Sequence, residues 1–323
     1  ANNLALKGLF YSDKGKNKNH IITTKIEHPS ILEVCKWLEK HGTKITYLDV
    51  DKEGLINIKE LEREINNKTL VVSIIQGNNE IGTLQNLEKI GELCKKKGVY
   101  FHVDACQSFT KSKIDVKKQN LSLVTINGHK IHGPKGIGAL YVRKGINLEP
   151  LSNGGGHENG IRSGTENVPA IVGFAEAVKV SSKSDVEYMK KLRDYTINKL
   201  INIHGTKING PMGEKRLCNN INISFGNIEG EAISNHLESY NIMVSTGSAC
   251  ASHSLKKSHV LKAIGLNDFE INSSIRITLS KYTKKEEINR FIKIIKQTIE
   301  VLRKISPFKV ESNRKLEKIN NEK

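Results

Sequence analysis

Apolar residues fall into short runs along the first half of the chain, and the segments between these runs are amphipathic. Residues 70–75 are almost wholly apolar, which is typical of a strand at the centre of a parallel sheet. The other runs are rich in β-branched and aromatic residues, which favour strands. Together they predict strands at residues 20–24, 44–48, 70–75, 100–103, 121–126 and 138–142.

The amphipathic segments between the strands carry the signals of helix ends. Pro29 suits a first helical turn, and Gly42 suits the position after a helix. Asn57 followed by Glu60 predicts a second helix start, and residues 86–97 form a third helix with lysines in its last turn. This alternation of strands and helices predicts an α/β fold whose sheet is mainly parallel and flanked by helices.

The pattern changes at about Glu187. Residues 221–225 and 274–280 alternate apolar and polar side chains, which is typical of half-buried strands. Thr283 and Glu286 are spaced as a capping box and predict the start of a long amphipathic helix. We therefore expect a large α/β domain over residues 1–186, a small α+β domain over 187–306 and a polar tail over 307–323.

The chain has 51 Lys and Arg residues against 34 Asp and Glu residues, a formal net charge of +17. A charge of this size invites a nucleic-acid partner. The lysines are spread along the whole chain, however, and the 5% of aromatic residues do not interleave with them as a base-stacking surface requires. We expect no nucleic-acid partner, and we expect the basic run 14–18 to be a solvated loop.

The five cysteines are widely spaced and include no Cys-x-x-Cys pair. This spacing argues against a disulfide framework and against a structural zinc site. Free cysteines are typical of a reducing compartment, so we expect a cytoplasmic protein or its organellar equivalent. No apolar stretch is long enough to span a bilayer, and we expect no membrane partner.

Two polar residues follow apolar strands, where α/β folds place their sites. Asp104 needs a cation or several donors, such as a protonated pyridine nitrogen, unless it only caps the next segment. Lys130 stands in a glycine-rich turn, where its amine can form a Schiff base unless it is one more surface charge. His129 and His132 beside it are too weak a pair to predict a metal.

A third candidate is a long glycine-rich loop over residues 151–167. Its backbone N–H groups, with Arg162 and Thr165, are suited to cradle an anion, although a mobile connector would have the same composition. A strand-end Asp, a glycine-flanked Lys and an anion cradle together fit a pyridoxal phosphate site.

Cys250 differs from the other cysteines in its surroundings. Its neighbours in sequence are all small, so a loop is expected there, and a thiol in such a loop is a candidate nucleophile. Cys35 and Cys94 lie on apolar helix faces and are expected to be buried packing residues.

Taken together, the motifs resemble those of a known family. From residue 1 to about residue 305 the chain resembles a cysteine desulfurase of the NifS/IscS type, within the class-V aminotransferases. That resemblance implies a seven-stranded-type sheet of the pyridoxal-phosphate transferase fold type I. It rests on Glu27-His28-Pro29, Asn78-Asn79-Glu80-Ile81-Gly82, His102-Val103-Asp104-Ala105-x-Gln107, Gly128-His129-Lys130-x-x-Gly133-Pro134-Lys135-Gly136, Arg162-Ser163-Gly164-Thr165, Ser248-Ala249-Cys250 and Ser274-Ile275-Arg276.

The resemblance also implies a role for each matching residue. The implied catalytic residues are Lys130 as the Schiff-base lysine, Cys250 as the sulfur-accepting nucleophile and His28 as the ring-stacking residue that helps proton transfer. The implied cofactor contacts are Asp104 at the ring nitrogen, Gln107 and Asn79 at the ring oxygen, His129 and Asn127 at the phosphate, and Thr165 at the phosphate of a partner subunit. The implied contacts to the substrate carboxylate are Arg276 and Asn79.

The implied reaction converts L-cysteine to L-alanine and leaves a persulfide on Cys250. A homodimer is expected, and the sulfur is expected to pass to an acceptor such as an iron–sulfur cluster scaffold protein. Three alternatives stay open at this point. The same scaffold is compatible with a selenocysteine lyase, with a sulfur donor for tRNA or DNA thiolation, and with an inactive fragment.

The sequence departs from the family pattern in two places. Family members begin with a further segment that carries a Gly-Thr-Glu-like phosphate loop, so we expect the chain to be a fragment with weakened cofactor binding. Asn127 stands where the family usually has a serine that touches the phosphate. An amide donates a hydrogen bond as a hydroxyl does, but its reach differs, so phosphate affinity is expected to change.

Overall fold

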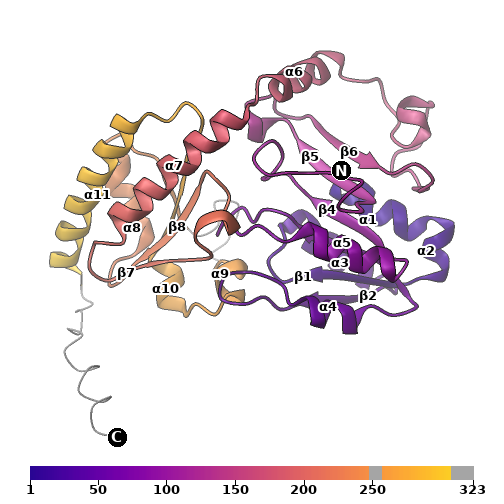
Figure 1. The fold of residues 1–323 in the computed structure, drawn as a ribbon, viewed down its shortest axis with the longest axis horizontal. Helices are drawn as coiled ribbons and strands as arrows, with labels where there is room; N and C mark the ends of the chain where they lie inside the picture. Colours follow the sequence, from indigo (N-terminus) through magenta and orange to yellow (C-terminus); the bar gives the residue numbers. More distant parts are fainter. Residues whose placement is uncertain (247–256, 307–323) are drawn as a thin grey trace, which may run out of the picture.

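The structure is a computed structural model that describes residues 1–246 and 257–306. These residues form two lobes, each built around its own sheet (Figure 1). The first lobe contains a six-stranded sheet and the second a four-stranded sheet. None of the helices in the described ranges has the length and apolar character needed to cross a bilayer.

The strands of the first sheet lie in the order β2-β1-β3-β4-β5-β6. The first five run parallel, and only β6 pairs antiparallel, with β5. The parallel strands therefore end at one edge of the sheet, where α/β folds bind ligands. Their bounds are β1 (His20–Thr24), β2 (Lys44–Leu48), β3 (Thr69–Ile75), β4 (Tyr100–Asp104), β5 (Leu123–Asn127) and β6 (Gly138–Val142).

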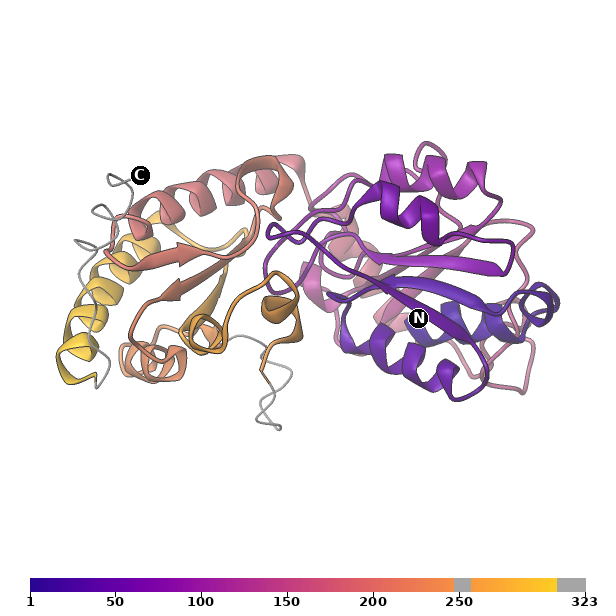
Figure 2. The ribbon, with the colours of Figure 1, turned by 90° about the horizontal axis from the view of Figure 1, so that it is seen from below.

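Helices cover both faces of this sheet, as Figure 2 shows for the lobe that carries the N-terminus. Side chains from α1 and α3 pack on one face, with Ile21 and Val71, and those from α4 and α5 pack on the other, with Ile22 and Val72. Each face is thus buried, which explains the wholly apolar central strand. The helices of this lobe are α1 (Asn2–Tyr11), α2 (Asp13–Asn17), α3 (Pro29–Glu39), α4 (Ile58–Glu64), α5 (Leu87–Lys96) and α6 (Val168–Lys179).

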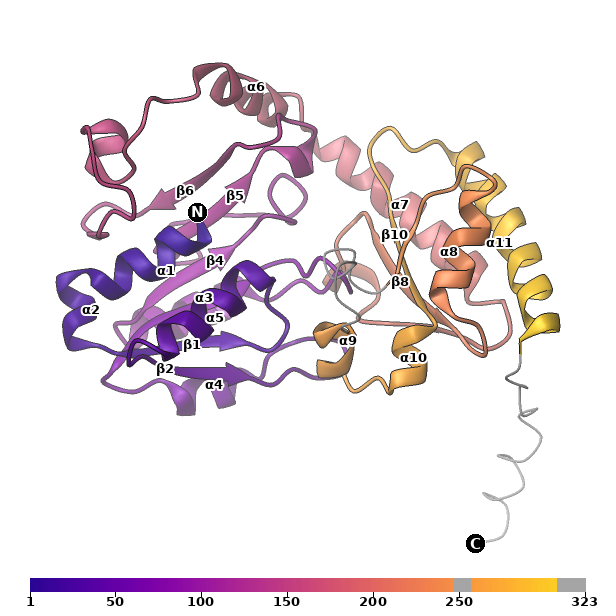
Figure 3. The same cartoon turned by 180° about the vertical axis from the view of Figure 1, so that it is seen from behind.

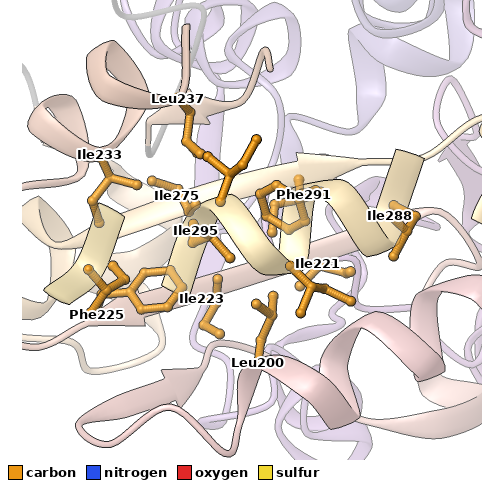
Figure 4. Packing of buried hydrophobic residues seen from close by; sticks show 14 of the residues in the cluster. Leu200, Ile221, Ile223, Phe225, Ile233, Leu237, Ile275, Ile288, Phe291 and Ile295 are labelled. Carbon is orange, nitrogen blue, oxygen red and sulfur yellow. The ribbon is translucent and has the colours of Figure 1, made fainter. Parts of the chain in front are cut away.

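The second sheet is antiparallel throughout, in the order β7-β8-β10-β9. Its apolar residues alternate with polar ones, and the apolar set packs under α7, α8 and α11 (Figure 4). The polar set of β8 and β10, which includes Arg276, faces away from that core. The elements are α7 (Lys183–Leu200), β7 (Thr206–Ile208), β8 (Asn220–Phe225), α8 (Gly230–Glu238), β9 (Ser245–Thr246), α9 (His259–Ala263), α10 (Asp268–Asn272), β10 (Ser274–Thr278) and α11 (Lys285–Ile305).

A loop of the first lobe joins the two sheets. Thr83 forms an isolated antiparallel bridge with Arg216, and Leu217 donates its N–H to the carbonyl of Gly82 at 2.8 Å. Gly82 has φ +74°, and a Cβ there would lie 2.6 Å from Oδ1 of Asn220, so no larger residue fits. Arg216 is 2% exposed, and its guanidinium donates to Oδ1 of Asn220 and to two backbone carbonyls.

The expected fold class is confirmed, with six strands in the described first sheet where the resemblance implied a seven-stranded type. The strand predicted at residues 121–126 lies at Leu123–Asn127, and the one predicted at 274–280 ends at Thr278. The run expected as a solvated loop contains the short helix α2, because the Ser12 hydroxyl accepts from the N–H of Gly15 and caps it.

The predicted capping box at the last helix was wrong by one residue. The hydroxyl of Thr283 accepts from the N–H of Ser280 and is engaged in the preceding turn. The carboxylate of Glu287 instead accepts from the N–H of Lys284, so α11 begins at Lys285. The predicted domain boundary between residues 186 and 187 falls inside α7, and the predicted tail 307–323 lies outside the described residues.

Candidate functional site

A cavity of about 350 Å³ lies where the two lobes meet at the carboxyl ends of the parallel strands. Both lobes contribute to its wall. Of the ten residues predicted for the site, five line this cavity: Asn79, Gln107, His129, Lys130 and Arg276. The topology therefore brings together residues that are almost 200 positions apart in the sequence.

Lys130 stands in the single helical turn η1 (His129–Ile131) that follows β5. The turn ends at His132, which has φ +65°, a conformation that non-glycine residues rarely adopt. Lys111 donates from Nζ to the carbonyl of Lys130 at 3.2 Å and to that of Gln107 at 3.0 Å. One ammonium group thus connects the backbone segments that follow β4 and β5.

Lys111 also lines the cavity, and it forms no ion pair with a carboxylate in the part of the chain that the structure describes. Burial is the main cause that lowers the pKa of Lys111 to about 8, with Cys218 opposing the shift and Lys130 reinforcing it. A buried ammonium with only carbonyl partners keeps its charge less readily than one beside a carboxylate. Lys111 is one of 51 basic residues, and no motif or spacing distinguishes it from the others.

Asp104 ends β4 and is 2% exposed. Its Oδ1 accepts from the N–H of Cys106 at 2.9 Å, and its Oδ2 accepts from Nδ2 of Asn2 at 2.8 Å. The first bond is the local cap that was considered as the alternative for this residue. Asp104 has no ion-pair partner among residues 1–246 and 257–306, so its carboxylate can still accept a bond from a cationic ring nitrogen.

His28 is the N-cap of α3 and lies close to Asp104. Its Nδ1 accepts from the N–H of Ser30 at 3.1 Å, so the proton of the neutral ring is on Nε2. Burial lowers the pKa of His28, an effect that Asp104 opposes and that Lys130 and His259 reinforce. The imidazole is therefore neutral near pH 7, with one nitrogen fixed as an acceptor and the other free to exchange a proton.

Arg276 reaches the cavity from β10 of the second lobe. Its Nη1 donates to the carbonyl of Asn79 at 3.0 Å. Its Nε is buried and has no hydrogen-bond partner within the described ranges. A buried guanidinium N–H without an acceptor is costly, and a carboxylate is the ligand that its fork of donors fits.

Four predicted residues are not brought into the cavity wall, and one lies outside the described residues. Asn127 ends β5, with Oδ1 buried and lacking a partner among the described residues. Thr165 is exposed, as is most of the glycine-rich loop around it. His28 and Asp104 lie close to each other, and neither lines the cavity. Cys250 lies outside the described residues.

Two cysteines of the first lobe are packing residues. Cys35 and Cys94 are buried as expected, and burial raises the pKa of each thiol to about 12. A thiol with so high a pKa is a poor nucleophile. Over the described residues, no three His, Cys, Asp or Glu side chains are grouped as metal ligands.

Asn2 and Ser30 are further site residues that sequence reasoning missed. Nδ2 of Asn2 donates to Oγ of Ser30 at 2.8 Å as well as to Asp104, and Oγ of Ser30 is 2.9 Å from Nδ1 of His28. A hydrogen-bond chain therefore runs from the carboxylate to the imidazole. The only signal in the sequence was an asparagine on the inward face of the first helix.

Comparison with known proteins identifies chains that share this arrangement. The sequence model of the family described as "Aminotransferase class-V" matches residues 1–291. A protein of Histophilus somni named cysteine desulfurase IscS is 47% identical over 314 residues, which are 95% of this chain and 76% of that protein. One of Methanosarcina thermophila with the same name is 42% identical over 319 residues, 98% of this chain and 78% of that protein.

Solved structures agree with these relatives. A structure titled "NifS-like protein" superposes with a TM-score of 0.86 at 38% identity and covers 93% of this chain and 80% of its own. A structure titled "SspA in complex with cysteine" has a TM-score of 0.76, also at 38% identity, over 88% of this chain and 79% of its own.

Proposed function

The chain belongs to the class-V aminotransferase family and is a pyridoxal-phosphate-dependent cysteine desulfurase, and we propose on this premise that it forms L-alanine and a persulfide on Cys250 from L-cysteine. The observation that carries the proposal is the shared cavity of Lys130 and Arg276. An amino-acid substrate on this cofactor requires an amine for the carbonyl group of the cofactor and a cation for its own carboxylate. Lys130 would supply the amine, and Arg276 would supply the cation through its Nε, which has no acceptor among the described residues.

The residues at the cavity fit the cofactor. When bound, pyridoxal phosphate supplies an aldehyde that takes up amines and a ring that withdraws electrons. Lys130 would hold the aldehyde. Asp104 would accept a hydrogen bond from the protonated ring nitrogen, in keeping with the burial of its carboxylate and the lack of an ion-pair partner for it within the described chain. Gln107 and Asn79 would contact the ring oxygen from the cavity wall.

The phosphate would be held by His129 and Asn127 on this chain. His129 lines the cavity, and Asn127, which ends β5, would donate to the phosphate from Nδ2 because its Oδ1 only accepts. Thr165 is exposed and would contact the phosphate of a partner subunit. The departure from serine at Asn127 makes phosphate affinity the property to measure first.

The substrate would be oriented by its carboxylate. Arg276 would donate to it through Nε, which has no other acceptor within the described ranges, while Nη1 stays on the carbonyl of Asn79. His28 would move protons to and from the substrate at Nε2, because Nδ1 is already engaged by Ser30. The hydrogen-bond chain through Asn2 and Ser30 would hold that imidazole against Asp104.

The sulfur step would be carried out by Cys250. Its thiolate would attack the sulfur of L-cysteine, so that an S–S bond forms and the Cβ–S bond of the substrate breaks. The electron pair of the broken bond stays on the carbon side, where protonation completes L-alanine. The enzyme is left with a Cys250 persulfide that can pass to an acceptor such as an iron–sulfur cluster scaffold.

A homodimer would supply Thr165 to the second site. Helix α6, which follows the loop of Thr165, exposes a set of apolar side chains: Val168 at 59%, Ile171 at 41% and Val172 at 62%. Contiguous exposed apolar residues of this kind mark protein interfaces. The free cysteines of the described residues are in keeping with the cytoplasm or an equivalent reducing compartment.

The test is an absorption and mass measurement on the purified chain. With added pyridoxal phosphate, the wild type is expected to show the visible band of lysine-bound cofactor, to change it on addition of L-cysteine, and to gain one sulfur atom on Cys250. Lys130→Ala is expected to lose the band, whereas Lys135→Ala, an exposed lysine of the same turn, keeps it.

Cys250→Ser separates the two halves of the proposal. It is expected to keep the band and its response to L-cysteine while gaining no sulfur. Sulfur on Cys106 or another cysteine instead would contradict the role of Cys250. A wild type without any band would mean that this chain has no working cofactor site.

A further inference from the structure

Two adjacent residues at the start of α9, Ser258 and His259, form hydrogen bonds with residues that are next in sequence to two predicted site residues. Oγ of Ser258 donates to Oε2 of Glu80, the residue after Asn79. Nε2 of His259 lies 2.9 Å from the carbonyl of Glu27, the residue before His28. Figure 3 shows α9 at the junction of the two lobes, next to the first sheet. Because a carbonyl only accepts, Nε2 of His259 carries the proton in this bond.

Glu80 is a buried carboxyl group that the reaction described above does not use. It is 2% exposed, and burial raises its pKa, while the Ser258 hydroxyl, His259 and Arg276 oppose that shift. A buried carboxyl group is retained only where its partners are fixed. Its hydrogen-bond partner Ser258 also caps α9, because Oγ accepts from the N–H of Leu261 at 3.1 Å.

The backbone of Glu80 is fixed as firmly as its side chain. Its carbonyl accepts from Nδ2 of Asn220 at 3.0 Å and from Nδ2 of Asn222 at 3.1 Å, and its N–H donates to Oδ1 of Asn78 at 2.8 Å. The preceding carbonyl, that of Asn79, accepts from Arg276. These bonds connect Glu80 to the strand that carries Asn222 and, through Asn79, to the guanidinium of Arg276, so a group that binds the Glu80 carboxyl is attached to the same framework.

Apolar packing supports the same attachment. Val260 and Leu261 of α9, with Ile264 directly after the helix, are buried in one cluster with Ile26 and Ile81. Ile26 precedes Glu27 in the sequence, and Ile81 follows Glu80. The start of α9 is thus attached to the first lobe by two hydrogen bonds, to Glu80 and to Glu27, and by apolar packing. In the sequence, Ser258 follows Cys250 by eight positions.

We propose that Ser258 and Glu80 are positioning residues for sulfur transfer, because their bond attaches the chain at Ser258, eight positions after Cys250, to the loop that contacts Arg276. The inference rests on the proposed function. It predicts that breaking the Ser258–Glu80 bond slows sulfur transfer to Cys250 while leaving substrate binding at Arg276 unchanged. A residue needed only for folding would affect both.

The experiment compares four variants with the full wild-type chain. Ser258→Ala and Glu80→Ala break the bond, whereas Ser258→Thr keeps a hydroxyl and Glu80→Gln keeps an acceptor oxygen. Ser12→Ala is the matched control, because Ser12 also caps a five-residue helix, α2, remote from the cavity. For each variant we would measure the single-turnover rate of persulfide formation on Cys250 and the affinity for L-alanine from the absorption titration of the bound cofactor.

The alanine variants at 258 and 80 are expected to lose about tenfold in the persulfide rate, the effect of about one hydrogen bond, with less than a twofold change in L-alanine affinity. Ser258→Thr, Glu80→Gln and Ser12→Ala are expected within about threefold of the wild type. The double variant should be no slower than either single variant, because one bond is lost in all three.

Hydrogen exchange provides a readout that does not depend on the reaction. In Glu80→Ala, amides 261–264 of α9 are expected to exchange faster than in Glu80→Gln. Unchanged persulfide rates in an active enzyme, or an equal loss of L-alanine affinity, would overturn the inference. If the wild type forms no persulfide, the proposed function itself is refuted. That result is obtained with the wild type alone, so it is distinguished from a failure of the positioning role.

Discussion

Nδ2 of Asn2 lies 2.8 Å from Oδ2 of Asp104, although 102 positions separate the two residues in the chain. The same amide donates to Ser30, the residue that holds the ring of His28. The first helix therefore sets the position of both the carboxylate and the imidazole of the site. The inward face of this helix packs on the sheet and also contributes a side chain to the candidate site.

Asn2→Ala is expected to destabilise the fold by about 1–3 kcal/mol, because it removes the donor to Oδ2 of the buried Asp104 carboxylate and to the hydroxyl of Ser30. Urea unfolding of the cofactor-free chain measures the change. Asn17→Ala removes an exposed asparagine of α2 and is expected within about 0.5 kcal/mol of the wild type. Equal losses in the two variants would show that the bond to Asp104 contributes nothing.

Glu27→Gln is expected to stabilise the protein at pH 8 and not at pH 5. Burial raises the pKa of Glu27 to about 8, against an ordinary value of 4.5, so the folded chain keeps a proton that the unfolded chain releases between these values. The contribution of this group is full below pH 4.5 and is lost as pH rises to 8. Glutamine is neutral throughout, so its advantage at pH 8 is about 2 kcal/mol or more.

The measurement is urea unfolding at both pH values, with Glu300→Gln as the control on an exposed carboxylate. The control is expected to show the same small difference at each pH. If the stability difference between Glu27→Gln and wild type does not change with pH, the Glu27 carboxyl group is ionised in the folded chain and the argument fails.

Lys111→Met is expected to weaken the binding of pyridoxal phosphate by about tenfold. The substitution keeps an unbranched side chain that is only one atom shorter but removes the donor from the carbonyls of Gln107 and Lys130. Absorption titration of the cofactor-free chain gives the dissociation constant. Lys135→Met changes an exposed lysine of the neighbouring turn and should bind as wild type does, and equal affinity in Lys111→Met would exclude a positioning role.

Val172→Glu is expected to convert a dimer to a monomer, because it introduces a charge into the exposed apolar set of α6. Sedimentation velocity measures the mass of each form. Val301→Glu changes an apolar residue that is 46% exposed on α11 and is expected to leave the dimer intact. A monomeric wild type, or a dimeric Val172→Glu, would contradict the proposed role of this face.

Periodicity predicted most of the fold because burial is nearly complete in the first lobe. The central strand β3 is buried at every residue, and the α5 helix buries one face only, so both patterns are visible in the sequence. The start of α11 was predicted one residue too early, because both Thr283 and Lys284 are followed three positions later by a glutamate. Lys284 is the N-cap because the hydroxyl of Thr283 is engaged by the N–H of Ser280, a contact that spacing does not reveal.

The site divides in the same way. Asp104 and Lys130 could be singled out because each follows an apolar strand and carries a chemistry that the surrounding pattern does not explain, whereas Arg276 was implied only by the resemblance to the family. Asn2, Ser30 and Lys111 could not be singled out, because their partners are chosen by tertiary packing: one ammonium meets two carbonyls, and one amide meets residues 28 and 102 positions away. No composition or motif distinguishes such residues from other polar residues.

The bridge between Thr83 and Arg216 has a consequence for unfolding. Loss of structure in the first lobe would remove the backbone partners that Thr83 and Gly82 provide for Arg216 and Leu217 of the second lobe. The two sheets are therefore expected to unfold together, in one cooperative transition with a denaturant dependence set by the surface that both lobes expose.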